Sequence, residues 1–180
     1  MSNHSSERDV TVLAEGKFDR LVRRGKWEYV ERRGISGIVG IVAITDDHKL
    51  LLVEQDRPPV GARVIELPAG LAGDIAGMEH EDLATAARRE LLEETGYAAR
   101  EMVWLAQGAA SAGISDEIIT LYLARGLSKA AKAVGDGSEK IIVHEVALIS
   151  VCEWLEDRRK AGWVIDLKIF AGLHLSMAYV

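Results

Sequence analysis

The chain has 180 residues, a size typical of one domain, and 48% of them are apolar, too many for a disordered protein. Its formal charge of −6 argues against a general nucleic-acid binder, which needs a basic face for the phosphates. The start, MSNHSSERD, does not resemble a secretory signal, the apolar run 37–44 is too short to cross a bilayer, and the single Cys152 excludes an internal disulfide. We therefore expect a cytoplasmic protein that does not bind membranes or nucleic-acid polymers.

The first third of the chain is expected to form β-strands. Alternating or β-branched apolar residues predict strands at 27–31, 38–45, 49–54 and 64–67. The segment 1–33 contains eight basic and six acidic residues, so it is slightly basic within an acidic protein. We expect this segment to form a small N-terminal β unit and residues 34–180 to form the main domain.

The remaining chain alternates between loops, helices and strands. A glycine-rich loop, LAGDIAGMEHED (71–82), precedes a helix predicted over 83–95 and stopped by Gly96. Glu81 and Asp82 stand at the helix start, where carboxylates suit the positive end of the helix dipole. Later segments predict strands at 102–105, 118–124 and 141–149, a polar turn at 134–140, and helices at 151–160 and 167–178. This mixture indicates an α+β or α/β sandwich fold.

The predicted helix 83–95 concentrates carboxylates on one face. At about 100° per residue, Glu90, Glu93 and Glu94 fall within an arc of roughly 100°. Such like charges repel one another unless a divalent cation is shared, and hard Mg²⁺ or Mn²⁺ prefers oxygen ligands. A solvated acidic face, partly neutralised by Arg89, is the alternative. The glycine-rich loop before the helix and the Gly-Tyr after it favour the metal site.

The stretch RRELLEETGY (88–97) resembles the signature of the Nudix hydrolase family, G-x5-E-x7-R-E-U-x-E-E-x-G-U, where U is a bulky apolar residue. Glu81, Arg89 and Tyr97 stand at the matching positions. The resemblance implies the Nudix fold, an α/β/α sandwich with a mixed sheet between helices. It covers residues 25–175 approximately, and the signature is its most specific part.

The front of the signature departs from the family pattern, because Ile75 stands where a glycine is expected before Glu81. In one interpretation, Gly70 of LPAGL is the signature glycine and five residues are inserted before Glu81. In the other, Gly73 and Glu79 form the G-x5-E part, and two extra residues precede the arginine. We favour the first, because LPAGL resembles the segment that opens the signature in this family.

The resemblance implies a metal site and a reaction. Its ligands would be Glu90, Glu93, Glu94 and the backbone carbonyl of Ala69. Arg89 would orient these carboxylates through charge-assisted hydrogen bonds, and Glu81 would be a structural or peripheral partner. The family hydrolyses nucleoside diphosphates linked to another moiety, and clustered metals can neutralise the pyrophosphate and activate water.

The flanking segments resemble the ADP-ribose pyrophosphatase branch of the family, also called ADP-sugar pyrophosphatases. The similar segments are VEQDR (53–57), ELPAGL (66–71), SAGISDE (111–117, with alanine in place of the usual proline) and the part from 139 to the helix that contains Trp154. By this resemblance, Arg57 would bind a substrate phosphate, Trp27 would stack on adenine across a dimer interface, and Glu66 would assist metal or substrate binding. The alternatives are a surface arginine for Arg57 and a core anchor for Trp27.

The general base is expected on a loop before the last strand. By resemblance it would be Glu139 in GDGSEKI, where glycines on both sides of the aspartate would let the loop close over substrate. An ordinary polar turn is the alternative reading, and Glu117 and Glu145 are the other candidates for the base. His144 is expected to be a strand residue rather than a ligand, because hard metals prefer oxygen.

These inferences predict a Mg²⁺-dependent enzyme, with Mn²⁺ as a possible substitute, that hydrolyses ADP-ribose or a similar nucleoside diphosphate sugar to AMP and a sugar phosphate. We expect a homodimer in which segment 1–33 is a dimerisation subdomain. GDP-mannose or another nucleotide sugar is the alternative substrate, and a non-catalytic nucleotide sensor is the alternative class. Residues 79–101 hold seven acids and three bases, so most of the net charge lies around the predicted metal site.

Overall fold

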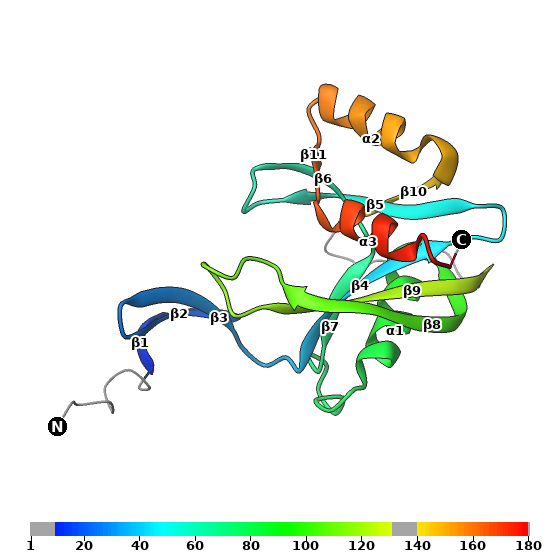
Figure 1. Ribbon diagram of the computed structural model, residues 1–180. Helices are drawn as coiled ribbons and strands as arrows, with labels where there is room; N and C mark the ends of the chain where they lie inside the picture. Colours follow the sequence, from blue (N-terminus) through cyan, green and yellow to red (C-terminus); the bar gives the residue numbers. More distant parts are fainter. Residues whose placement is uncertain (1–9, 131–139, 180) are drawn as a thin grey trace.

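The computed structural model of the chain describes residues 10–130 and 140–179. A mixed eight-stranded sheet with helices on both faces forms the main body, and a three-stranded antiparallel sheet precedes it (Figure 1). The strands are β1 (Val10–Glu15), β2 (Asp19–Arg24), β3 (Trp27–Arg32), β4 (Gly37–Ile44), β5 (Lys49–Arg57), β6 (Ala62–Glu66), β7 (Ala69–Ala72), β8 (Tyr97–Ala109), β9 (Ile118–Lys129), β10 (Ile142–Ala147) and β11 (Val164–Ile165). The helices are α1 (Leu83–Thr95), α2 (Val151–Lys160) and α3 (Lys168–Ser176), with a 3₁₀ turn at Leu148–Ser150. No helix in these described ranges is long and apolar enough to span a membrane.

The central strand β4 organises the large sheet. The strand order is β11-β6-β5-β4-β9-β8, while β10 pairs with β5 and β7 pairs with β4. Strand β4 runs parallel to β9, but it pairs antiparallel with β5 near its end and with β7 over Gly37–Gly40. This pairing holds Ala69 and Gly70 beside the middle of the sheet, where α1 also packs.

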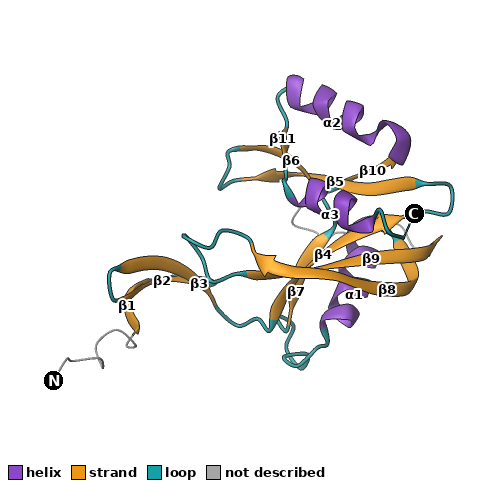
Figure 2. Cartoon of the chain, in the orientation of Figure 1, coloured by secondary structure: helices purple, strands orange, loops and turns teal. Residues whose placement is uncertain are grey.

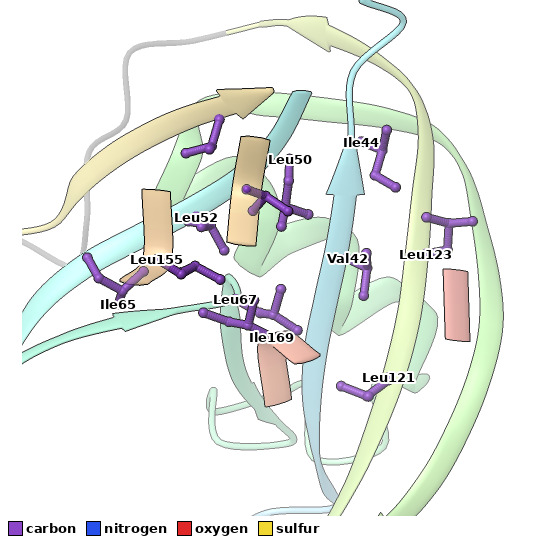
Figure 3. Close-up of a cluster of buried hydrophobic side chains, with 12 residues drawn as sticks. Val42, Ile44, Leu50, Leu52, Ile65, Leu67, Leu121, Leu123, Leu155 and Ile169 are labelled. Atoms are coloured by element: carbon purple, nitrogen blue, oxygen red, sulfur yellow. The ribbon is translucent and has the colours of Figure 1, made fainter. Parts of the chain in front are cut away.

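The core consists of two apolar layers, one on each face of the sheet. Side chains alternate between the faces along a strand, so Val42 of β4 packs under α2 and α3, whereas Ile41 packs under α1. The layer under α2 and α3 includes Leu155 and Ile169 (Figure 3). On the other face, Leu91 of α1 is fully buried. This burial fixes which side of α1 turns away from the sheet.

Helix α1 has a defined cap at each end. The Asp82 carboxylate accepts hydrogen bonds from the backbone N–H groups of Thr85 (3.0 Å) and Ala84 (3.4 Å). Gly96 ends the helix in the left-handed region, with φ 76°, and its N–H donates to the Leu92 carbonyl. The bounds predicted from the sequence for this helix are therefore confirmed.

The predicted sandwich fold and the N-terminal β segment are confirmed (Figure 2). The sequence indicated only strand 27–31 in that segment, whereas the structure has β1 and β2 as well. The N-terminal sheet is attached through β3: Val30 N–H donates to the Ile114 carbonyl, and Asp116 N–H donates to the Val30 carbonyl. The division of the chain at residue 34 stays a prediction.

Several predicted bounds were wrong, among them the end of the strand expected at 118–124, which continues to Lys129 as β9. The loop expected from residue 71 begins with the end of β7, because pairing with β4 satisfies the hydrogen bonds of this backbone. The strand expected at 102–105 is part of the much longer β8, and the strand expected to reach 149 ends at Ala147. Ile149 is 97% exposed, so the apolar residue there does not mark a buried strand. The predicted turn 134–140 lies outside the described residues, apart from its last position.

The cap of α1 provides a test of this local structure. We expect Asp82→Ala to lower the free energy of unfolding by about 1 kcal/mol, because two N–H groups lose their acceptor. Urea denaturation followed by circular dichroism measures the change. The control variant Asp82→Asn keeps an acceptor oxygen and should retain most of the stability. Equal stability of the alanine variant and the parent would contradict the capping role.

Candidate functional site

A cavity of about 340 Å³ lies where β7 faces the second half of α1. Its lining residues are Arg57, Ala69, Gly70, Leu71, Asp74, Ile75, Arg89, Glu90, Glu93, Glu94 and Ile141. The structure therefore brings the three predicted carboxylates of α1 to one cavity with Ala69, although β7 and α1 are separated by a long loop. We refer to it below as the carboxylate cavity.

The Arg89 guanidinium connects the walls of the carboxylate cavity. Its Nη1 donates to Glu90 (2.7 Å) and to Glu93 (3.4 Å), both on α1. Its Nη2 donates to the Leu71 carbonyl of β7 (2.8 Å) and to Glu81 (3.1 Å), which precedes the helix. Burial acts to lower the pKa of Arg89, but the hydrogen bonds to Glu81 and the charge of Glu90 raise it above its usual value. Arg89 thus contacts two of the three predicted ligands, and its orienting role stays a prediction.

Glu94 is buried and Glu90 is half-buried, and the pKa of each is raised. Glu94 is 8% exposed and accepts a hydrogen bond from the Ala69 N–H (3.0 Å). Burial raises its pKa to about 8, and that hydrogen bond offsets only part of the rise. Burial also raises the pKa of Glu90 to about 7, although the Arg89 charge opposes it. A positive charge placed in the cavity would favour the ionised forms of both groups.

Gly70 gives the Glu90 carboxylate its place against β7. A Cβ atom at position 70 would overlap the Glu90 carboxyl group, so only glycine leaves this space open. Glu81 bonds to Arg89, whereas Glu79 accepts a hydrogen bond from the Gly77 N–H in an exposed turn. These contacts favour the alignment in which Gly70 and Glu81 belong to the signature and the extra residues lie between them.

Arg57 reaches the carboxylate cavity from the end of β5. Its Nε donates to Glu66 (2.7 Å), and Glu66 also accepts from the Gln55 side chain (3.0 Å). The Arg57 side chain is therefore restrained by its ion pair with Glu66 rather than free at the surface. Glu66 lies behind it and is absent from the lining of the cavity.

Trp27 lies away from the carboxylates. It stands on β3 with 59% of its surface exposed, so the alternative of a core anchor is wrong. It lines a separate cavity of about 320 Å³ with Arg24, Tyr29 and the loop that contains Gly113. Among the described residues of one chain, no residue lines both this cavity and the carboxylate cavity.

The candidates for a general base are not assembled at the cavity within the described residues. Glu139 lies outside those residues, so its role stays a prediction. Glu117 pairs with Arg32 (2.8 Å), and Glu145 accepts a hydrogen bond from the Tyr97 hydroxyl (2.6 Å). Neither glutamate lines the carboxylate cavity.

His144 lies on β10, as the sequence predicted. Its ring bonds to Glu54 (2.7 Å) and packs against Trp154 at a centroid distance of 5.0 Å. These contacts hold the imidazole on the sheet face that α2 covers. His144 is a strand residue rather than a ligand of the carboxylate cavity.

The donor chemistry of the carboxylate cavity fits a hard divalent cation, since it offers several carboxylate oxygens beside the backbone of β7. In the described part of the chain, no three acidic, histidine or cysteine side chains converge closely enough to hold a metal as they stand. Glu90 and Glu93 bond to Arg89 instead, and Glu94 bonds to Ala69. Metal binding would therefore require these side chains to turn towards the cation.

Sequence reasoning missed two groups of this site. Asp74 lines the cavity 3.7 Å from Arg89, and the Leu71 carbonyl accepts one of the Arg89 hydrogen bonds. Asp74 comes from the inserted stretch, for which the signature offers no template. The Leu71 carbonyl is a backbone group, so the type of side chain at position 71 does not indicate its role.

The chain is similar to several known proteins. The NUDIX domain model matches residues 36–163. Over 124 residues the chain is 40% identical to the methanol dehydrogenase activator of Bacillus methanolicus, and over 123 residues it is 35% identical to the ADP-ribose pyrophosphatase of Bacillus subtilis. Each match covers 68% of this chain and 64% of the relative, so the chain spans less than two thirds of their length.

A further relative and a solved structure are also similar to this chain. The ADP-ribose pyrophosphatase of Mycobacterium tuberculosis is 43% identical over 91 residues, which cover 51% of this chain and 42% of that protein. A crystal structure of an ADP compounds hydrolase superposes with a TM-score of 0.74 at 20% identity, covering 96% of this chain and 91% of the other. At that identity the superposition shows the fold.

Replacing Gly70 tests how the cavity is built. We expect Gly70→Ala to fold with a nearly unchanged melting temperature, because the three atoms nearest to the new methyl group all belong to the flexible end of Glu90. Displacing that carboxylate should weaken Mn²⁺ binding at least about tenfold, as measured by electron paramagnetic resonance. Gly108→Ala is the control, since a Cβ there meets nothing within 4 Å. Unchanged Mn²⁺ affinity in Gly70→Ala would contradict this role.

The pH dependence of stability tests the buried carboxylates. Because the pKa of Glu94 rises to about 8 on folding, the folded state holds a proton that the unfolded state releases near its usual, lower value. Stability should therefore fall as pH rises from 6 to 8, by on the order of 2 kcal/mol for this group. Thermal unfolding in EDTA measures it.

In Glu94→Gln this loss of stability should be smaller, because the amide does not titrate, and the loss that remains belongs to Glu90, whose pKa is also raised. The control Glu153→Gln, at an exposed position of α2, should behave like the parent. The same pH dependence in Glu94→Gln and the parent would show that Glu94 does not cause this loss of stability.

Proposed function

The chain belongs to the NUDIX domain family, and on that premise we propose that it hydrolyses the pyrophosphate bond of ADP-ribose or a similar nucleoside diphosphate sugar, giving AMP and a sugar phosphate. One observation carries the proposal: Arg89 holds Glu90 and Glu93 at a cavity that also contains the buried Glu94. The ADP-ribose pyrophosphatases among the relatives support the choice of substrate.

The proposed cofactor is Mg²⁺, for which Mn²⁺ would substitute. The residues that would hold it are Glu90, Glu93, Glu94 and, through its carbonyl, Ala69. When bound, the ion would supply charge neutralisation for the pyrophosphate and activation of water. The protein's own contribution is orientation: Arg89 restrains two of the glutamates, and the Ala69 N–H restrains the third.

Arg57 is proposed to bind a phosphate of the substrate. Its guanidinium lines the same cavity as the carboxylates and is held from behind by Glu66. Arginine presents planar paired donors that match phosphate oxygens, so a restrained guanidinium both attracts and orients the diphosphate. The proposed assistance of Glu66 is therefore indirect, through Arg57.

Trp27 is proposed to stack on the base of the nucleotide. Its exposed ring and the neighbouring Tyr29 line an open cavity, and aromatic faces accept any base. Because this cavity and the carboxylate cavity share no lining residue within one chain, we propose a homodimer in which segment 1–33 serves the site of the second copy. Exposed Val12 and Phe18 on the same small sheet support an interface there.

Glu139 is proposed as the general base, on the strength of the family resemblance. Ile141, two residues later, lines the carboxylate cavity, and this position supports the proposal. GDP-mannose or another nucleotide sugar remains the alternative substrate, and a nucleotide sensor remains the alternative class. We further propose that the enzyme acts in the cytoplasm.

A substrate panel tests the proposed function. The panel contains ADP-ribose, GDP-mannose, UDP-glucose, NADH and dinucleoside polyphosphates, each with Mg²⁺, and chromatography measures the products. We expect ADP-ribose to be cleaved fastest, to AMP and ribose phosphate. Glu93→Gln should lower kcat at least about 100-fold, because a proposed ligand is lost, while Glu153→Gln should leave kcat unchanged.

Two outcomes would contradict the proposal. If no member of the panel gives a product with either Mg²⁺ or Mn²⁺, the proposed hydrolase activity is excluded. Saturable nucleotide binding without products would then favour the sensor.

A further inference from the structure

A second cavity, of about 390 Å³, lies at the far end of β4. It is lined by Ile44, Thr45, Asp46, His48, Arg100, Leu123, Arg125, Gly126 and Tyr179. Figure 1 shows how the segment after α3, drawn in red, reaches this end of the sheet beside the turn between β4 and β5. We refer to it as the arginine cavity.

The arginine cavity is separate from the carboxylate cavity. Gly40 of β4 is the strand partner of Ala69, whereas Ile44 lies four residues further along, roughly 13 Å at the rise of a strand. Ile44 and Leu123 belong to the apolar layer under α2 and α3, while the carboxylates project from α1 on the opposite face. The two cavities have no lining residue in common.

The charges of the arginine cavity favour an anion. Among the described residues, neither Arg100 nor Arg125 forms an ion pair, although Glu101 is the strand partner of Arg125. Asp46 is the one acidic residue among the described residues of the lining. With His48 counted as neutral, these described residues carry a net charge of +1, in a chain whose net charge is −6.

Gly126 fits the Arg100 side chain against β9. It has a φ of 61°, and a Cβ placed on it would come within 3.1 Å of the Arg100 Nε and 3.3 Å of its Cζ. Any larger residue would push this guanidinium away from the strand. The relation parallels that of Gly70 and Glu90, where a glycine also lets a charged group lie against the backbone.

We propose that the arginine cavity is a second ligand site, which binds a small phosphomonoester. Two guanidinium groups offer the planar paired donors that phosphate oxygens accept. The apolar floor of Ile44 and Leu123 would receive the carbon part of the ligand, and Asp46 would accept a hydrogen bond from one of its hydroxyl groups. The volume lies within the range of small-molecule sites. This site is independent of the proposed hydrolysis and needs no metal.

Isothermal titration calorimetry tests the proposal on the full chain. Ribose 5-phosphate and inorganic phosphate are the probes, and EDTA excludes binding through a metal at the carboxylate cavity. We expect saturable binding of ribose 5-phosphate at one site and weaker binding of phosphate. The double variant Arg100→Gln/Arg125→Gln should weaken binding at least about tenfold, because it removes both charged donors.

Two control variants locate the effect. Arg23→Gln/Lys26→Gln removes the same charge from the exposed strand β2 and the turn after it, and Glu93→Gln alters the carboxylate cavity; both should bind like the parent. No saturable binding up to about 10 mM would overturn the proposal. Equal loss of affinity in both double variants would also overturn it, because that result indicates attraction by net charge alone.

Discussion

The functional part of this molecule depends on one side chain, Arg89. Its guanidinium is largely buried and bonds to a carbonyl of β7, to Glu81 before the helix, and to Glu90 and Glu93 on the helix itself. It thereby links three parts of the chain around one cavity. A lysine would not reproduce these contacts, because its ammonium group lacks the planar fork that lets Arg89 reach four partners.

The same interaction explains why crowded carboxylates are tolerated. Arg89 neutralises part of the charge of Glu90 and Glu93, but Glu94 receives only a backbone hydrogen bond and is almost fully buried. Burial is the main cause that raises the pKa values of Glu90 and Glu94. A divalent cation bound there would favour the ionised forms of both groups, which is why we propose these carboxylates as metal ligands.

Local patterns predicted the helix well. Its stop at Gly96 and the spacing of its glutamates are set within a short stretch of sequence, and the structure has them as predicted. The capping hydrogen bonds of Asp82 were not predicted, because the sequence analysis placed this carboxylate at the helix start only for its charge. The fold class also followed from the succession of strands and helices. Contacts between distant segments were harder to predict from the sequence. Strand β7 forms because β4 pairs with it, and Asp74 lines the cavity because an insertion folds back towards Arg89. The separation of Trp27 from the carboxylates likewise depends on how the N-terminal sheet is attached.

The central claim is that these oxygens bind a divalent cation, and anomalous diffraction from a crystal soaked in Mn²⁺ tests it most directly. The account predicts a strong anomalous peak within coordination distance of Glu90, Glu93, Glu94 and the Ala69 carbonyl, with the glutamates turned from their present partners towards the ion. A peak elsewhere, or no peak in crystals that bind Mn²⁺ in solution, would contradict the ligand set and the mechanism that rests on it.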